Sequence, residues 1–174
     1  MSVDAAVTPS FSDRHSAVTA LFRTHHARLV GLARLLVDDL ATAEDVVQDA
    51  FAGLYRQWPW MRNPDAAVSY LNATVANGAR STLRHRMVVR RTKTEAPPDV
   101  PSAESSVIRD EQAHAVLAAL RTLPARQRQV LVLRYYLDQS EAEIASTLSI
   151  SRGSVKQHAS RGIATLGARL EAAR

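Results

Sequence analysis

The sequence predicts an all-α fold in which two small helical domains are joined by a flexible linker. Apolar residues recur at three- and four-residue steps along most of the chain, which is the period of an amphipathic helix. No run shows the strict alternation of a half-buried strand. Residues 92–105 hold three prolines and almost no large apolar side chain, so they cannot bury enough surface to fold. The 174 residues suffice for one ordinary domain or two small ones.

These patterns divide the chain into four segments. We predict a disordered tail at residues 1–15, a first domain at 16–90, the linker at 91–106 and a second domain at 107–174. Because cysteine is absent, the chain has no disulfide framework, no cysteine nucleophile and no thiolate metal site. No apolar run is long enough for a bilayer and no secretory signal is visible, so we expect a cytoplasmic protein without membrane insertion.

Two helices open the first domain. The first runs from about Ser16 to Leu36. Its expected inward positions are Val18, Leu21, Phe22, Leu29, Leu32 and Leu36. The second begins near Thr42, whose hydroxyl is expected to cap the first turn. Glu44 and Asp45 would lie in that turn, where the helix dipole favours negative charge. This helix ends before Pro59, and its expected buried stripe is Val46, Val47, Ala50, Phe51 and Leu54.

A loop and a third helix complete the first domain. Asn63-Pro64-Asp65 reads as a helix start with an asparagine cap, and the helix continues to about residues 86–90. The loop before it carries two tryptophans. We expect Trp58 to close the small core, whereas Trp60 fits equally well in the core or in stacking on unpaired bases.

Four helices are predicted in the second domain. Pro124 opens the second of them, and Ser140 caps the third in a capping box with Glu143. Ser149-Ile150-Ser151 forms a tight turn, and the fourth helix runs from Arg152 to about Leu170. The expected inward positions of the fourth helix are Val155, Ala159, Ile163 and Leu166.

The last two of these helices indicate a helix-turn-helix that binds duplex DNA. Side chains that donate to bases or phosphates remain on the outer side of its second helix. They are Arg152, Ser154, Lys156, Gln157, Ser160 and Arg161. Residues 112–174 also hold nine basic and four acidic residues, which favours a polyanionic partner. A plain helical hairpin with a basic outer face is the alternative.

The second helix of the first domain carries an acidic face. Its members are Glu44, Asp45, Gln48 and Asp49. The spacing alone leaves open a docking face for a basic partner, an ordinary solvated face, and a metal site that would add Asp38 and Asp39. Nothing else in the sequence supplies an open coordination position, so we expect neither a metal nor any cofactor.

A basic face on the third helix favours nucleic-acid binding. Asn77, Arg80, Ser81 and Arg84 lie at helical steps on one face. Residues 80–93 contain six Lys or Arg and no acidic residue. Trp60 and Arg62 precede this face in the loop, where they could stack on unpaired bases.

These segments together resemble the extracytoplasmic-function (ECF) sigma factors, a group of the sigma-70 family of bacterial RNA polymerase subunits. The matching motifs are AEDVVQDAF at Ala43–Phe51, LP-x-x-x-R from Leu123, SEAEIA at Ser140–Ala145 and SVK at Ser154–Lys156. The resemblance covers about residues 16–90 and 106–170, which form a region 2-like and a region 4-like domain. The arginine- and alanine-rich composition resembles that of actinobacterial proteins.

The resemblance implies a role for each surface. The residues that match the stretch docking on the coiled coil of the polymerase's largest subunit are Asp45, Gln48, Asp49 and Phe51. Those that match the −10 reader and its base-capturing loop are Trp60, Arg62, Asn63, Asn77, Arg80, Ser81 and Arg84. Those that match the −35 reader are Arg152, Ser154, Lys156, Gln157, Ser160 and Arg161. The second domain would also meet the flap of the second-largest subunit.

The expected function is therefore promoter recognition by core RNA polymerase and initiation through −35 binding and −10 melting, with no catalysis by this chain. The main alternative is a stand-alone helix-turn-helix regulator, which would bind duplex DNA without polymerase. A polymerase adaptor that reads no DNA and a carboxylate-metal nuclease fit fewer of the residues. The sequence leaves open the target promoters and whether an anti-sigma factor holds the chain inactive.

Overall fold

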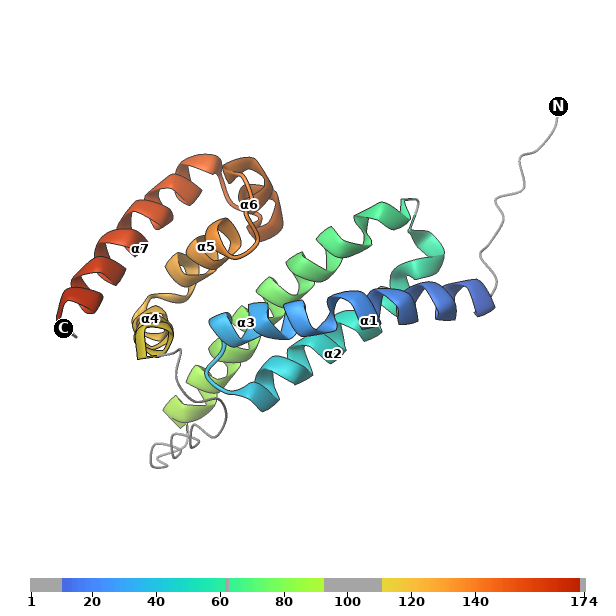
Figure 1. Cartoon of the computed structure of the whole chain (residues 1–174), viewed down its shortest axis with the longest axis horizontal. Coiled ribbons are helices and arrows are strands. Elements are labelled where there is room, and N and C mark those ends of the chain that lie inside the picture. The colour runs from blue at the N-terminus through green and yellow to red at the C-terminus, as the bar shows by residue number, and fades with distance from the viewer. Residues whose placement is uncertain (1–10, 62, 93–110, 173–174) are drawn as a thin grey trace.

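The computed structural model describes residues 11–61, 63–92 and 111–172, and it is helical throughout these ranges apart from short turns (Figure 1). Its α-helices are α1 (Phe11–Leu36), α2 (Leu40–Gln57), α3 (Ala67–Thr92), α4 (Glu111–Thr122), α5 (Ala125–Tyr135), α6 (Glu141–Leu148) and α7 (Arg152–Ala172). Two 3₁₀ turns, Trp58–Trp60 and Pro64–Ala66, join α2 to α3. The all-α prediction is confirmed for the described ranges. Most of the predicted linker and the first ten residues of the predicted tail lie outside them.

The first domain is a bundle of α1, α2 and α3 around an apolar core (Figure 1). Leu32, Leu54 and Leu71, one from each helix, are fully buried. Leucines at these positions remove a large apolar area from water, which is the main stabilising contribution to a domain of this size. The bundle leaves one side of α2 and one side of α3 outside this core.

The first helix begins earlier than its apolar pattern indicates. It starts at Phe11, whereas the sequence predicts a disordered tail up to residue 15. The guanidinium of Arg14 lies over the ring of Tyr55, 4.3 Å from its centroid, and thereby ties the first turn of α1 to α2. A cation over an aromatic face is attractive, so this contact gives the polar first turn a tertiary anchor.

The start of α2 also differs from the prediction. Asp39, not Thr42, is the N-cap, and its carboxylate accepts hydrogen bonds of 2.8 Å from both the amide and the hydroxyl of Thr42. Because the helix begins at Leu40, Glu44 and Asp45 lie beyond the first turn. Both residue types cap helices well, and here the guanidinium of Arg86 bonds both of them.

The second domain packs α4, α5, α6 and α7 around Leu133, Ile144 and Val155, all fully buried. The predicted capping box at the start of α6 is present: Ser140 bonds the amide of Glu143, and the carboxylate of Glu143 accepts from the amide of Ser140. The helix ends at a left-handed Ser149, with φ of 52°, so the chain turns sharply into α7.

Two apolar side chains that the periodicity places on inward faces are exposed: Phe22 is 40% exposed and Ile163 47%. Val116 of α4 is likewise 39% exposed. The helical period identifies the apolar face of an element but does not ensure that another element covers it. Val116 and Ile163 line a surface groove described below.

The two domains touch in this structure. The side of the second domain that carries α5 and α6 lies against α1 and α3, and α7 lies on the outer side, away from the first bundle (Figure 1).

Candidate polymerase and DNA interface

The acidic face of α2 is a solvent-exposed surface. Glu44, Asp45, Gln48 and Asp49 are all exposed, whereas Val46, Val47 and Ala50 between them are buried. The helix therefore presents carboxylates and an amide on one side and packs the other side into the bundle. Such a surface suits a basic partner helix, because the charges remain hydrated until the partner arrives.

Phe51 does not belong to that exposed surface. It is only 6% exposed, and its ring packs edge-on against Phe22 with the centroids 5.0 Å apart. The prediction that Phe51 lies on the buried stripe of α2 is confirmed, and its place in the stretch that matches the polymerase-docking motif stays a prediction. Phe51 supports the acidic face from behind.

The loop between α2 and α3 separates the two tryptophans. Trp58 is 9% exposed and belongs to the core, as predicted, whereas Trp60 is 72% exposed. Asn63 is exposed and caps the following turn by accepting 2.9 Å from the amide of Asp65. An exposed indole beside a polar loop is available for stacking. Arg62, which lies between Trp60 and Asn63 in the sequence, is outside the described residues.

The proposed DNA face of α3 points partly toward the second domain. Asn77, Ser81 and Arg84 are exposed and Arg80 is half-buried. The side-chain amide of Asn77 donates 2.9 Å to the main-chain oxygen of Thr147 in α6. Burial and then the neighbouring charge of Arg80 lower the pKa of Arg126 in α5. The part of this basic face that carries Asn77 and Arg80 therefore lies against the second domain.

The outer face of α7 is open to solvent. Arg152, Lys156, Gln157, Ser160 and Arg161 are exposed, and Val155 and Ala159 on the opposite side are buried. Ser154 is half-buried, and its amide bonds the hydroxyl of Ser151 at 3.0 Å, so it helps to start the helix. Lys156 lies 3.8 Å from the half-buried Glu141 of α6, and because Lys156 itself is exposed, the ion pair contributes little to stability.

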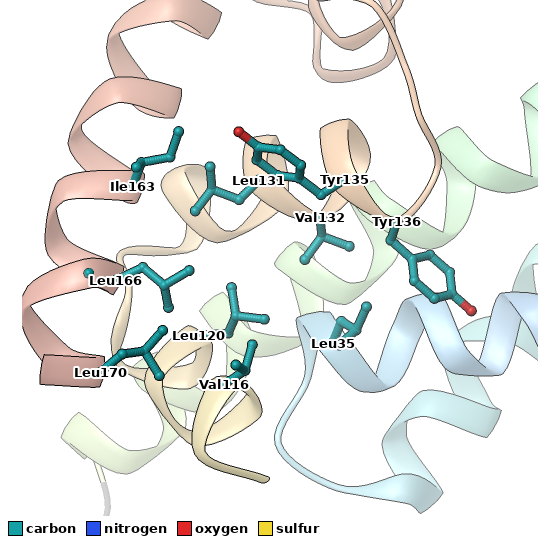
Figure 2. Close-up of a pocket in the computed structure, with 11 residues that line it drawn as sticks. Leu35, Val116, Leu120, Leu131, Val132, Tyr135, Tyr136, Ile163, Leu166 and Leu170 are labelled. Atoms are coloured by element: carbon teal, nitrogen blue, oxygen red, sulfur yellow. The ribbon is translucent and has the colours of Figure 1, made fainter. Parts of the chain in front are cut away.

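An apolar groove is a surface feature that sequence reasoning missed. It holds about 530 Å³, and Figure 2 shows its lining side chains. They are Leu35, Val116, Leu120, Leu131, Val132, Tyr135, Tyr136, Ile163, Leu166, Gly167 and Leu170. All but Leu35 come from the second domain. The only sequence signal is an excess of apolar positions on α4, α5 and α7 beyond those that one small core can bury.

Within the described ranges, no group of three or more His, Asp or Glu side chains is placed to hold a metal ion. Asp39 is bonded to Arg86, and Asp38 lies 3.8 Å from Arg128, so these two carboxylates are engaged away from Asp45 and Asp49. Among the described helices, none is long and apolar enough to cross a membrane.

Comparisons with known proteins identify both domains. The family model of sigma-70 region 2 matches residues 21–88, and that of sigma-70 region 4 matches residues 113–166. The chain is 31% identical to the RNA polymerase sigma-E factor of Streptomyces coelicolor, over 83% of this chain and 80% of that protein. It is 34% identical to the ECF RNA polymerase sigma factor SigM of Mycobacterium tuberculosis, over 88% and 76% respectively.

The chain belongs to the ECF sigma factors. The resemblance stated from the motifs is thus confirmed, and so is its actinobacterial character. As a sigma factor, this protein serves promoter-directed initiation of transcription, and sigma factors are regulatory rather than catalytic proteins. Core RNA polymerase and promoter DNA are its partners.

Two solved structures share the fold of this sigma factor. One is RpoE of Bartonella quintana in complex with the anti-sigma factor NepR, with a TM-score of 0.68 and 23% identity over 90% of this chain and 97% of that one. The other is CnrH in complex with the cytosolic domain of CnrY, with a TM-score of 0.64 and 23% identity over 91% and 95%. At this identity the likeness concerns the fold alone.

Proposed function

We propose that this sigma factor uses three separate surfaces in initiation. The acidic face of α2 docks on core polymerase, the outer face of α7 reads the −35 duplex, and α3 with the preceding loop holds the melted −10 strand. The observation that carries this proposal is that the carboxylates of α2 and most donors of α7 are exposed opposite buried apolar stripes of the same helices, while Trp60, Ser81 and Arg84 are exposed on the first domain. A surface built only to pack would not present clustered charges and amides to solvent.

The polymerase surface consists of Asp45, Gln48 and Asp49, with Phe51 behind it. Opposite charges across an interface mainly accelerate association and fix its orientation. The acidic face fits a basic helical partner, which the family places in the coiled coil of the largest subunit. Removing both carboxylates should therefore weaken polymerase binding without disturbing the fold, because both are exposed.

The −35 surface consists of Arg152, Lys156, Gln157, Ser160 and Arg161, with Ser154 at the helix start. Arginine pairs with guanine and glutamine with adenine in the major groove, whereas lysine holds phosphates. The first turns of a recognition helix enter that groove. We assign base reading to Arg152 and Gln157 and phosphate contacts to Lys156 and Arg161.

The −10 surface combines the exposed Trp60 with Asn63 and the basic face of α3, and the loop residue Arg62 completes the set. Extracting a base from duplex costs a few kcal/mol of stacking and pairing, which a waiting pocket compensates. Trp60 offers an indole on which such a base can stack. Asn77, Arg80, Ser81 and Arg84 then follow the strand beyond that base.

The apolar groove gives the second domain a place for an amphipathic helix, and we assign it to the flap of the second-largest polymerase subunit. Apolar grooves bind helices through side chains at helical spacing. An anti-sigma factor is a further proposed partner, since one similar structure is a complex with an anti-sigma factor and another is a complex with the cytosolic domain of CnrY. Such a partner would compete with the flap if it used the same groove. Because polymerase and chromosome are cytoplasmic, we place the chain there too.

Run-off transcription with core polymerase on genomic fragments tests this proposal. Wild type should give discrete transcripts that core polymerase alone does not, and Asp45→Ala/Asp49→Ala should weaken them. Glu171→Ala is the matched control, because Glu171 is an exposed carboxylate at the end of α7, outside all three surfaces. Salt-sensitive duplex binding with no transcripts would instead favour a stand-alone regulator.

A further inference from the structure

One carboxylate lies between two basic side chains beside the −35 surface. Glu141 directly follows the N-cap Ser140, so it occupies the first turn of α6. Its two carboxylate oxygens lie 3.7 Å from the guanidinium of Arg134 in α5 and 3.8 Å from the ammonium of Lys156 in α7. The three helices pack against one another, and α6 lies beside the start of α7 (Figure 1). Glu141 therefore forms a charged bridge between α5 and α7 on the surface of the second domain.

This bridge contributes little to holding the domain together. Both of its distances are longer than a hydrogen bond, so the side chains attract one another through their charges alone. The side chain of Lys156 is 68% exposed and that of Arg134 is 38% exposed. Water and salt screen such a pair, and the side chains lose rotational freedom in forming it. The charges of the bridge are thus available to respond to a charged partner.

The bridge lies where the phosphates of a bound duplex would run. In a helix-turn-helix the second helix enters the major groove, and the first helix crosses the DNA backbone. Here α6 is the first helix, so its first turn faces phosphates. A surface pocket of about 430 Å³ opens there, and its polar lining consists of Arg134, Glu141, Lys156 and Ser160. A phosphate at this pocket would meet two cations and a hydroxyl, but also a carboxylate that repels it.

The other acidic side chains in the described part of the second domain are placed differently. They are Glu111, Asp138, Glu143 and Glu171. Glu143 accepts hydrogen bonds from Ser140 in the capping box, and Glu171 lies at the opposite end of α7 from the recognition turns. Within the described residues, Glu141 is the one carboxylate that an ion pair joins to the −35 surface. Its effect on DNA binding is therefore a local one.

We propose that Glu141 is an internal counter-ion that weakens the sequence-independent part of duplex binding at the −35 surface. Lys156 must leave Glu141 before it contacts a phosphate, and the carboxylate repels the phosphate that approaches. The base contacts assigned to Arg152 and Gln157 do not involve the bridge. A duplex therefore has to satisfy those base contacts before it is occupied at a given protein concentration. This inference rests on the role of α7 given under the proposed function.

The same bridge should reduce the salt dependence of binding. A cation that contacts DNA releases a condensed counter-ion from the duplex, and this release drives binding at low salt. When Lys156 exchanges Glu141 for a phosphate, the freed carboxylate attracts cations from solution again. The second event partly cancels the first. Glu141 acts on DNA through Lys156 and Arg134 and is thus a positioning residue.

Three substitutions isolate the charge of this carboxylate. Glu141→Gln removes the charge and keeps the size of the side chain. Glu141→Asp keeps the charge and should keep most of the wild-type behaviour. Glu171→Gln is the matched control, because it removes one negative charge from an exposed position of the same domain, away from the −35 surface. Urea titration of all three checks that the domain stays folded, since a carboxylate in the first turn also stabilises a helix through its dipole.

Fluorescence anisotropy of the full chain with random-sequence duplexes tests the proposal. We expect Glu141→Gln to bind about five-fold more tightly than wild type at about 50 mM salt, and its log–log salt slope to be steeper by up to about 1. The advantage should then almost vanish at about 200 mM salt. Glu141→Asp and Glu171→Gln should stay close to wild type. Weaker binding by Glu141→Gln would overturn the proposal, because it would show that the carboxylate holds Lys156 in place for the phosphate.

A double-mutant cycle tests whether Glu141 acts through its partners. Lys156→Ala should reduce duplex affinity more in the Glu141→Gln background than in wild type, because the lysine there gives up no partner on binding DNA. The same should hold for Arg134→Ala. Equal costs in the two backgrounds for both cations would overturn the proposal. A simple loss of helix stability would not produce this dependence on the basic partners.

The outcomes distinguish this inference from the function on which it rests. If Glu141→Gln binds no more tightly than wild type, but Lys156→Ala still weakens binding in a salt-dependent way, only the role of Glu141 fails. If duplex binding depends on neither Lys156 nor Arg161, or is absent at low salt in every variant, the assigned role of α7 fails as well. Run-off transcription gives a second readout: polymerase with Glu141→Gln should produce transcripts from more genomic fragments than polymerase with wild type.

Discussion

Arg86 near the end of α3 donates a 2.7 Å hydrogen bond to Asp39, the residue that caps the start of α2. Arg86 also bonds the hydroxyl of Thr42, so one guanidinium holds the whole cap. Burial opposes the charged form of Asp39, but the hydrogen bonds from Arg86 and Thr42 outweigh it and lower the pKa of Asp39 to about 2. The carboxylate therefore joins two helices of the first domain.

The first prediction concerns acid stability. Since the pKa of Asp39 falls from 3.8 to about 2 on folding, its ionised form stabilises the native state above pH ~4, and this contribution is lost as the pH falls toward 2. The full contribution is about 2 kcal/mol. Asp39→Asn should lower the free energy of unfolding at pH 7 and flatten its pH dependence below pH ~4. Glu44→Gln, at an exposed carboxylate, should keep the wild-type slope in urea titrations.

The second prediction concerns the capping box of α6. Ser140→Ala removes the hydroxyl that bonds the amide of Glu143 and should lower the free energy of unfolding by about 1 kcal/mol. Ser146→Ala is the control, because Ser146 is exposed in the body of the same helix, where alanine is favourable. Thermal unfolding followed by circular dichroism compares the two. Equal midpoints would show that the cap is not needed.

The third prediction uses two glycines of α7. A Cβ at Gly162 would lie 3.0 Å from Leu131 of α5, whereas one at Gly167 would meet nothing within 4 Å. Gly162→Ala should therefore destabilise the second domain by about 1–3 kcal/mol through overpacking. Gly167→Ala should stabilise it by up to about 1 kcal/mol through helix propensity. Chemical denaturation of the full chain measures both, and changes of the same sign would contradict the packing of α5 on α7.

The fourth prediction separates the two tryptophans. Trp58→Ala empties a core position and should cost about 3–5 kcal/mol of stability. Trp60→Ala should change stability by less than about 0.5 kcal/mol, because its ring is in solvent. It should nevertheless reduce run-off transcription from a duplex promoter and much less from a template with a pre-melted −10 bubble. An equal defect on both templates would remove Trp60 from strand opening.

The fifth prediction distinguishes phosphate contact from base reading on α7. Lys156→Ala should weaken duplex binding for all sequences and reduce the magnitude of the log–log salt slope by about 1. Gln157→Ala should leave that slope unchanged and relax the preference at one base pair by about 1–3 kcal/mol. Titration of labelled duplexes at several salt concentrations reads out both. A slope change in Gln157→Ala alone would exchange the two assignments.

Much of the fold was predictable because its signals are local. The capping box at Ser140 and the proline before α5 need only neighbouring residues, and both lie where the sequence predicts them. The N-cap of α2 was not predictable in this way, because Asp39 and Thr42 can each cap a helix. The choice between them depends on their contacts with Arg86, which lies in another helix. The first turn of α1 was missed for the same reason, since its anchor is Tyr55 in another helix.

For the functional surfaces, the sequence predicts which side of a helix carries the polar residues, but not which parts of a helix another element covers. The period places the carboxylates of α2 and the donors of α7 outside correctly, but it also places Ile163 inside, where no element covers it. The contact between domains leaves no sequence signal at all. Gln129 donates to a main-chain oxygen, and because every residue carries such an oxygen, no complementary residue type marks the partner.

The opposite exposures of Trp58 and Trp60 have a practical consequence for spectroscopy. They are the two tryptophans of the chain, so its intrinsic emission is the sum of a blue-shifted signal from a buried indole and a red-shifted signal from a hydrated one. A base stacked on Trp60 would quench the red component alone. The ratio of the two bands is therefore a label-free record of when a promoter strand arrives, with the buried ring as its internal reference.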